Sequence, residues 1–108
     1  DFAKASLGSE YSVAWEQVEN IAKAIKEFKK QGYTIIAIEQ AKNSIHFKKY
    51  NLKKGQKVVI IPGNEVDGVP KAILKLADVI LELPMRSMKE SLNVSVATGI
   101  ILYHLLDN

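Results

Sequence analysis

The residues of this sequence that could bind a ligand or do chemistry gather in two short polar segments. The first follows the apolar run that ends at Ile61 and reads Pro-Gly-Asn-Glu-x-x-Gly, with glycine at 63 and 68. Open α/β sheets bind ligands in loops at the carboxyl ends of strands, and glycine there permits positive φ and close approach of a ligand to the backbone. An ordinary loop rich in turn residues explains the same letters. The pattern therefore predicts either a ligand-binding loop or a plain turn.

The second segment, Ser91-x-Asn93, opens a helix predicted over residues 93–106. Each of the two side chains is a strong N-cap candidate, because it can accept a hydrogen bond from an unpaired N–H of the first turn. Capping does not explain the run from Leu92 to Ala97, in which small and polar residues alternate with branched apolar ones. N-capping alone therefore leaves this run unexplained.

Other kinds of site do not fit these residues. The sequence has neither the G-x-G-x-x-G dinucleotide fingerprint nor a P-loop, and Glu65 and Asp67 would repel a phosphate at the first segment. Its two histidines, His46 and His104, are far apart in the sequence without carboxylate or thiolate company, so we expect no metal. No serine lies in a G-x-S-x-G elbow, which argues against serine hydrolysis.

Length and composition predict one globular domain. The chain has 108 residues, 47% of them hydrophobic, and no cysteine. Its longest apolar runs, such as 58–62 and 99–106, are too short to span a bilayer, and no secretion signal is visible. We therefore expect a cytoplasmic protein that has no membrane segment.

Basic residues are concentrated in one stretch. Residues 40–64 contain no acidic residue and carry six lysines. This stretch is therefore formally +6, while the rest of the chain is −3. With His46, Phe47 and Tyr50 interleaved, the stretch could contact a phosphate backbone. A solvated lysine-rich connection explains it equally well. The RNA-contacting lysines on the first interpretation are Lys48, Lys49, Lys53 and Lys54.

Periodicity predicts the elements that position these segments. Residues 12–31 read as an amphipathic helix with Val18, Ile21, Ala22, Ile25 and Phe28 on one face, ended by Gly32. Apolar runs at 33–39, 57–61 and 79–83 predict buried strands, and Pro70 starts a short helix to about residue 76. Alternating strands and helices predict an α/β layer with a largely parallel sheet.

Taken in order, these segments resemble a known family. The segment Ile61-Pro62-Gly63-Asn64-Glu65, the turn Leu83-Pro84-Met85 and the run from Ser91 to Gly99 are similar to the second and third motifs of the SpoU (TrmH-like) RNA methyltransferases. The resemblance covers most of the chain. The family's first motif, with an asparagine and a catalytic arginine, would lie upstream, and the sequence holds no equivalent of it.

The resemblance implies a fold and a reaction. The fold is an α/β, parallel-sheet, SPOUT-type trefoil-knotted methyltransferase domain, of which residues 1–108 would be the C-terminal part without the first-motif portion. These enzymes use S-adenosylmethionine to methylate ribose 2′-hydroxyls, so the expected function is 2′-O-methylation of tRNA or rRNA. Two alternatives stay open: a catalytically inactive knotted binding or assembly module, and an unrelated nucleotide-binding α/β domain.

The resemblance also assigns residues. Three loops at the carboxyl ends of strands would hold the methyl donor, and the positions that match are Ile38, Glu39, Gly63, Asn64, Leu83, Met85, Ser91 and Leu92. The supporting catalytic positions are Glu65, Ser91 and Asn93, whereas Arg86, the only arginine, does not match the first-motif arginine. The last helix is apolar nearly all round, which predicts a homodimer with residues such as Ile101 or Leu105 near the two-fold axis.

Overall fold

The computed structural model describes residues 2–4, 15–63, 68–84 and 90–107. Its strands and helices follow the predicted order, with two additional short strands. In chain order the elements are β1 (Phe2–Lys4), α1 (Trp15–Lys30), β2 (Thr34–Ile38), β3 (Ile45–His46), the 3-10 turn η1 (Phe47–Lys49), β4 (Val58–Pro62), α2 (Lys71–Leu74), β5 (Val79–Glu82) and α3 (Glu90–Leu106).

The strands form one sheet in the order β1-β4-β2-β5-β3, and every neighbouring pair is parallel. The predicted α/β class with a parallel sheet is confirmed. β1 and β3, at the two edges, were not predicted. They have three and two residues, too few for a periodic pattern, and β3 lies within the lysine-rich stretch.

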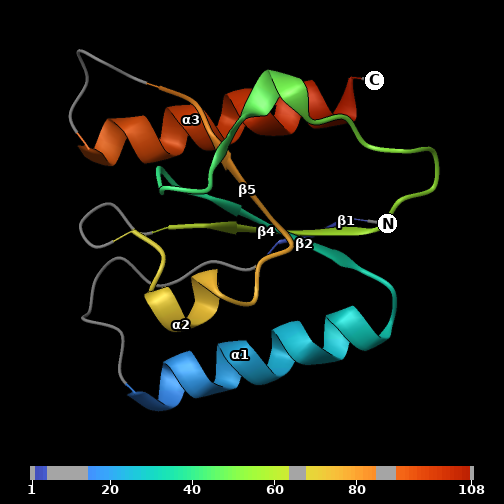
Figure 1. The fold of residues 1–108 in the computed structure, drawn as a ribbon, viewed down its shortest axis with the longest axis vertical. Helices are drawn as coiled ribbons and strands as arrows, with labels where there is room; N and C mark the ends of the chain where they lie inside the picture. The colour runs from blue at the N-terminus through green and yellow to red at the C-terminus, as the bar shows by residue number, and fades with distance from the viewer. Residues whose placement is uncertain (1, 5–14, 64–67, 85–89, 108) are drawn as a thin grey trace.

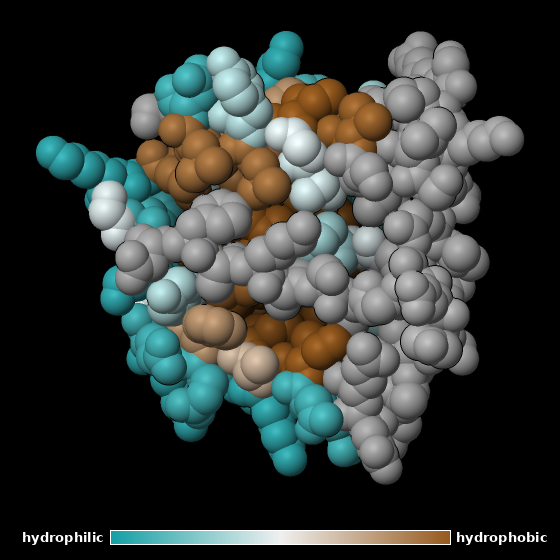
Figure 2. All heavy atoms as spheres, turned by 180° about the vertical axis from the view of Figure 1, so that it is seen from behind, coloured by the Kyte–Doolittle hydropathy of each residue, from teal (hydrophilic) through white to brown (hydrophobic). Residues whose placement is uncertain are grey.

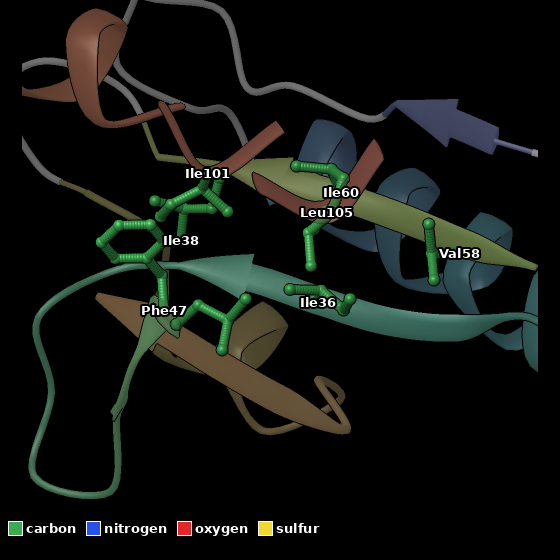
Figure 3. Close-up of a cluster of buried hydrophobic side chains, with 8 residues drawn as sticks. Ile36, Ile38, Phe47, Val58, Ile60, Ile101 and Leu105 are labelled. Atoms are coloured by element: carbon green, nitrogen blue, oxygen red, sulfur yellow. The ribbon is translucent and has the colours of Figure 1, made fainter. Parts of the chain in front are cut away.

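Helices cover both faces of the sheet, with α1 and α2 on one side and α3 with η1 on the other (Figure 1). Because successive residues of a strand point to opposite faces, β2 sends Ile35 toward α1 and Ile36 toward α3. The two resulting cores are separate. The core on the α3 side, shown in Figure 3, contains Ile36, Ile38, Phe47, Val58, Ile60, Leu81, Ile101 and Leu105.

The amphipathic pattern of α1 is confirmed where the structure describes it. Ile25 is fully buried, and Val18, Ile21, Ala22 and Phe28 pack around the same core. Gly32, just after the helix, has a φ of 91°, the left-handed conformation predicted for the residue that ends it. The short helix α2 begins at residue 71, so Pro70 is its N-cap rather than part of its first turn.

The position of α3 corrects two sequence-based expectations. The helix begins at Glu90, so Ser91 and Asn93 lie inside its first turn and are not its N-cap. Ile101 and Leu105 are 0% and 2% exposed within the protein's own core, so the expectation that they face a partner is wrong. The outward residues are Ile100, Tyr103 and Leu106, which are 40%, 71% and 64% exposed. Figure 2 shows apolar side chains reaching the surface over this layer.

Candidate functional site

The three central strands, β4, β2 and β5, have their carboxyl ends at the same end of the sheet, which is called the candidate edge below. Ile38, the last residue of β2, pairs with Pro62 of β4 on one side and with Leu81 of β5 on the other. Since all three strands run in the same direction, the segments after them leave the sheet side by side. The structure therefore brings together four residues predicted for the cofactor loops: Ile38, Glu39, Gly63 and Leu83.

Two of these four residues, Ile38 and Leu83, are apolar. Ile38 is 8% exposed and belongs to the core under α3, and the half-buried Leu83 packs against the same core. Both side chains are thus held by packing within the chain. Apolar side chains beside backbone N–H and C=O groups are the usual lining of a small-molecule site.

Glu39 connects all three strand ends. Its backbone N–H donates to Leu81 O at 3.1 Å, which extends the pairing of β2 with β5 by one residue. Its carboxylate accepts a hydrogen bond from Val69 N at 2.7 Å through Oε1 and from Gln40 N at 3.2 Å through Oε2. A single side chain therefore ties the end of β2 to the segment that follows β4.

Of the two glycines of the first polar segment, one has the predicted backbone conformation and one does not. Gly68 has a φ of 69°, as predicted, and a Cβ there would overlap the Glu39 carboxylate. Gly63 does not have positive φ, so that part of the prediction is wrong. A Cβ on Gly63 would lie 2.7 Å from the carbonyl carbon of Gly68 and 2.9 Å from Val69 N. Gly63 is required because the chain packs against itself at this point.

A second carboxylate at the edge holds the loop after β2. Glu82, the last residue of β5, hydrogen bonds to the Ser44 hydroxyl, and Ser44 Oγ also lies 2.8 Å from Ala41 O and accepts from Ala41 N at 3.3 Å. Sequence analysis missed Glu82 and Ser44. The available signal was a carboxylate at the end of a predicted buried strand, a position that requires a polar partner.

The side chains of six predicted site residues lie outside the described part of the structure. Asn64, Glu65 and Met85 lie outside the described residues. For Ser91, Leu92 and Asn93 the structure describes only the backbone, which forms the first turn of α3. Their roles as catalytic or donor-binding residues stay predictions.

The lysine-rich stretch is an ordered part of the fold. The lysines predicted to contact RNA, Lys48, Lys49, Lys53 and Lys54, are all exposed, but they form two groups. The first pair lies in η1, directly after the carboxyl end of β3. The second pair lies in the turn before β4, at the opposite end of the sheet, where Lys57 O accepts from Thr34 N at 2.8 Å.

The aromatic residues of this stretch belong to the fold. Phe47 is 5% exposed and lies between two histidine rings, stacked on His46 with centroids 5.1 Å apart and edge-on to His104 at 5.2 Å. The hydroxyl of Tyr50 accepts from Gln56 Nε2 at 3.0 Å. Phe47 is therefore a core residue, and RNA binding by the exposed lysines of this stretch stays a prediction. Among the described residues, no group of three or more His, Asp or Glu side chains could hold a metal ion.

Comparison with known proteins places this geometry in a family. The model of the SpoU rRNA Methylase family matches residues 1–103. The tRNA (guanosine(18)-2′-O)-methyltransferase of Aquifex aeolicus is 43% identical over 96 residues, covering 89% of this chain and 44% of the relative. The enzyme of the same name from Escherichia coli strain K12 is 36% identical over 104 residues, covering 94% and 43%. The chain thus spans less than half the length of these relatives.

Two solved structures have the same fold. The A. aeolicus TrmH/SpoU tRNA modifying enzyme superposes with a TM-score of 0.65 at 30% identity, covering 95% of this chain and 58% of that one. An AdoMet-bound rRNA methyltransferase from Sinorhizobium meliloti gives a TM-score of 0.65 at 28% identity, covering 77% and 31%. The alternative of an unrelated nucleotide-binding domain is excluded. With its parallel sheet, its converging strand ends and a family match over nearly its whole length, the chain belongs to the SpoU rRNA Methylase family.

Proposed function

We propose that this chain carries the S-adenosylmethionine-binding and dimerising part of an RNA 2′-O-ribose methyltransferase that acts on tRNA or rRNA. The observation that supports this most is the convergence of the segments after β2, β4 and β5 at one edge. A structural relative that carries AdoMet has the same fold. Residues 1–108 would form the C-terminal part of the methyltransferase domain, with the family's trefoil knot.

The residues at the edge fit a methyl donor. The half-buried Leu83 offers apolar surface, and the ends of the strands offer backbone N–H and C=O groups suited to the polar edges of adenine and ribose. Gly68 leaves room for the Glu39 carboxylate, and Gly63 leaves room for the Gly68–Val69 backbone, so both glycines serve the packing of the segments that border the site. When bound, S-adenosylmethionine would supply an activated methyl group on its sulfonium. Asn64, Met85, Ser91 and Leu92 complete the proposed donor site.

Methyl transfer requires more than donor binding. The ribose hydroxyl must be aligned with the methyl group and must lose its proton. Glu65, Ser91 and Asn93 are the supporting polar residues of this proposal, whereas the first-motif arginine is not among these 108 residues. We therefore expect donor binding without methyl transfer from this chain by itself.

Titration calorimetry and a methyl-transfer assay on the same 108-residue chain test this function. We expect S-adenosylmethionine and S-adenosylhomocysteine to bind one per chain, ATP not to bind, and transfer to tRNA to be absent. Transfer should appear once an upstream segment with the first motif is joined to the chain. Donor binding without transfer in that longer protein would instead support the inactive binding or assembly module.

RNA binding by the lysine-rich stretch can now be tested as two pairs. If the RNA lies across the candidate site, reversing charge at Lys48 and Lys49 should weaken tRNA binding and flatten its salt dependence, because fewer counterions are released. The matched control reverses Lys53 and Lys54, at the opposite end of the sheet. Equal effects of the two double variants would contradict a specific RNA path across the site, and no effect of either would make the stretch a solvated connection.

A homodimer through α3 completes the proposal. Ile100, Tyr103 and Leu106 expose apolar surface that a second copy could bury. The partner-facing residues proposed here replace Ile101 and Leu105. Within the described residues, no helix is long and apolar enough to cross a membrane. A cytoplasmic location stays a prediction.

A further inference from the structure

Each oxygen of the Glu39 carboxylate accepts a hydrogen bond from the chain's own backbone. One oxygen accepts from Val69 N at 2.7 Å, and the other accepts from Gln40 N at 3.2 Å. The shorter bond joins residues thirty positions apart and is of the charge-assisted kind, which is stronger than a neutral hydrogen bond. A side chain with this geometry is suited to holding backbone in place.

The backbone that Glu39 holds is packed from two sides. The Glu39 carboxylate lies on one side of Gly68, where it leaves no room for a Cβ. Gly63 lies against Gly68 and Val69 on the other side, where a Cβ would come within 2.8 Å of Gly68 Cα. The two ends of the 63–68 segment are therefore in contact, and Glu39 holds the second end. In the sequence this segment carries Asn64 and Glu65.

Val69 anchors the same point to the core. Its side chain is 6% exposed and packs in the cluster that includes Ile73 of α2 and Ile61 of β4. Its N–H donates to Glu39 Oε1 at 2.7 Å. A buried N–H that loses its acceptor is costly, so removing the Glu39 carboxylate should displace this backbone or admit water.

We propose that Glu39 is a positioning residue of the methyl-donor site, whose carboxylate fixes the backbone at Gly68 and Val69 and does not itself pair with the donor. This inference rests on the proposed function. An acidic residue near the cationic sulfonium could have either of two roles: it could pair with the donor, or it could hold the backbone in place. A carboxylate that paired with the donor would favour S-adenosylmethionine over the uncharged thioether of S-adenosylhomocysteine, whereas a positioning carboxylate serves both ligands equally.

Three substitutions of Glu39 distinguish these roles. Glu39→Gln keeps an oxygen that can accept from Val69 N but has no charge, and Glu39→Asp keeps the charge but is one methylene too short to reach. Glu39→Ala removes both. The neighbouring Gln40→Ala is the matched control, because Gln40 is exposed and donates only through its backbone. A cooperative thermal unfolding transition shows that a variant is folded. If Glu39→Ala does not fold, the test is made with Glu39→Gln and Glu39→Asp alone.

Two measurements are made on each variant. The first is hydrogen exchange of the Val69 amide without ligand, which we expect to be slow in the unchanged chain, in Glu39→Gln and in Gln40→Ala, and faster in the other two. The second is calorimetric affinity for S-adenosylmethionine and S-adenosylhomocysteine. Loss of the bond to Val69 should lower the affinity for both ligands by about tenfold in Glu39→Asp and Glu39→Ala. The affinity of Glu39→Gln should stay within about threefold of that of the unchanged chain.

The outcomes that would overturn the proposal are specific. Unchanged Val69 exchange in Glu39→Ala would show that the carboxylate does not hold this backbone. Weak binding in Glu39→Gln with normal binding in Glu39→Asp, or a loss confined to S-adenosylmethionine, would make Glu39 a direct partner of the donor. If the unchanged chain bound neither ligand, the proposed function would fail and the positioning role would fall with it, even with the Val69 result intact.

Discussion

Replacing Gly63 by alanine tests the packing at the candidate site directly. The new Cβ would lie 2.7 Å from the carbonyl carbon of Gly68, 2.8 Å from its Cα and 2.9 Å from Val69 N, all of them backbone atoms. Restoring a carbon–carbon contact of about 3.5 Å requires the Gly68–Val69 backbone to move by roughly 0.8 Å. The hydrogen bond from Val69 N to Glu39, now 2.7 Å long, would then be stretched beyond the normal range.

The expected cost combines overpacking with partial loss of this bond. Overpacking of about 1–3 kcal/mol and a weakened bond to a charged group together predict destabilisation by about 2–4 kcal/mol, or a fall in melting temperature of about 10–20 °C. Donor affinity should fall with it. Gly99→Ala is the control, because its Cβ meets nothing within 4 Å, and alanine is the better helix former by up to about 1 kcal/mol. If Gly63→Ala has the same melting temperature as the unchanged protein, Gly63 does not pack against Gly68 and Val69 as the structure shows.

Further substitutions test other parts of the fold. Asp78→Ala removes a side chain that accepts from Ile35 N at 2.7 Å, and because it is partly exposed we expect a loss of about 1 kcal/mol in urea unfolding, with Asp78→Asn close to normal. The Thr98 hydroxyl is buried and has no hydrogen-bond partner within the described part of the chain, so Thr98→Val should gain up to about 1 kcal/mol. Leu106→Glu should leave the chain folded but monomeric by light scattering, while Leu105→Glu, which buries a charge, should prevent folding; a dimer that survives Leu106→Glu would contradict the proposed interface.

Sequence reasoning located the elements whose hydrophobic pattern is regular. The face of α1 could be predicted from the spacing of Val18, Ile25 and their neighbours, because only one side of that helix is apolar. In α3 this signal is absent. Residues 100–106 are apolar on every side except His104, so nothing in their order distinguishes the buried Ile101 and Leu105 from the exposed Tyr103 and Leu106. The buried face of such a helix is decided by the sheet it packs on.

The candidate site shows a similar division. The positions of Glu39, Gly63 and Leu83 at one edge could be predicted, because parallel strands place their carboxyl ends together. The reason for glycine at position 63 could not be predicted. Its neighbours Gly68 and Val69 come close through the folded path of the chain, and the requirement is a contact distance and not a backbone conformation.

The most direct test of the account is to locate the methyl donor on the chain by NMR. Titrating S-adenosylmethionine into the isotopically labelled 108-residue protein should shift the amides of Glu39, Gly63, Gly68 and Leu83, at the carboxyl ends of β2, β4 and β5. The amides of the turn at residues 53–56, at the opposite end of the sheet, should not move, and ATP should produce no comparable shifts. Saturating donor that leaves the four amides unmoved, or that shifts the 53–56 turn instead, would contradict the proposed site.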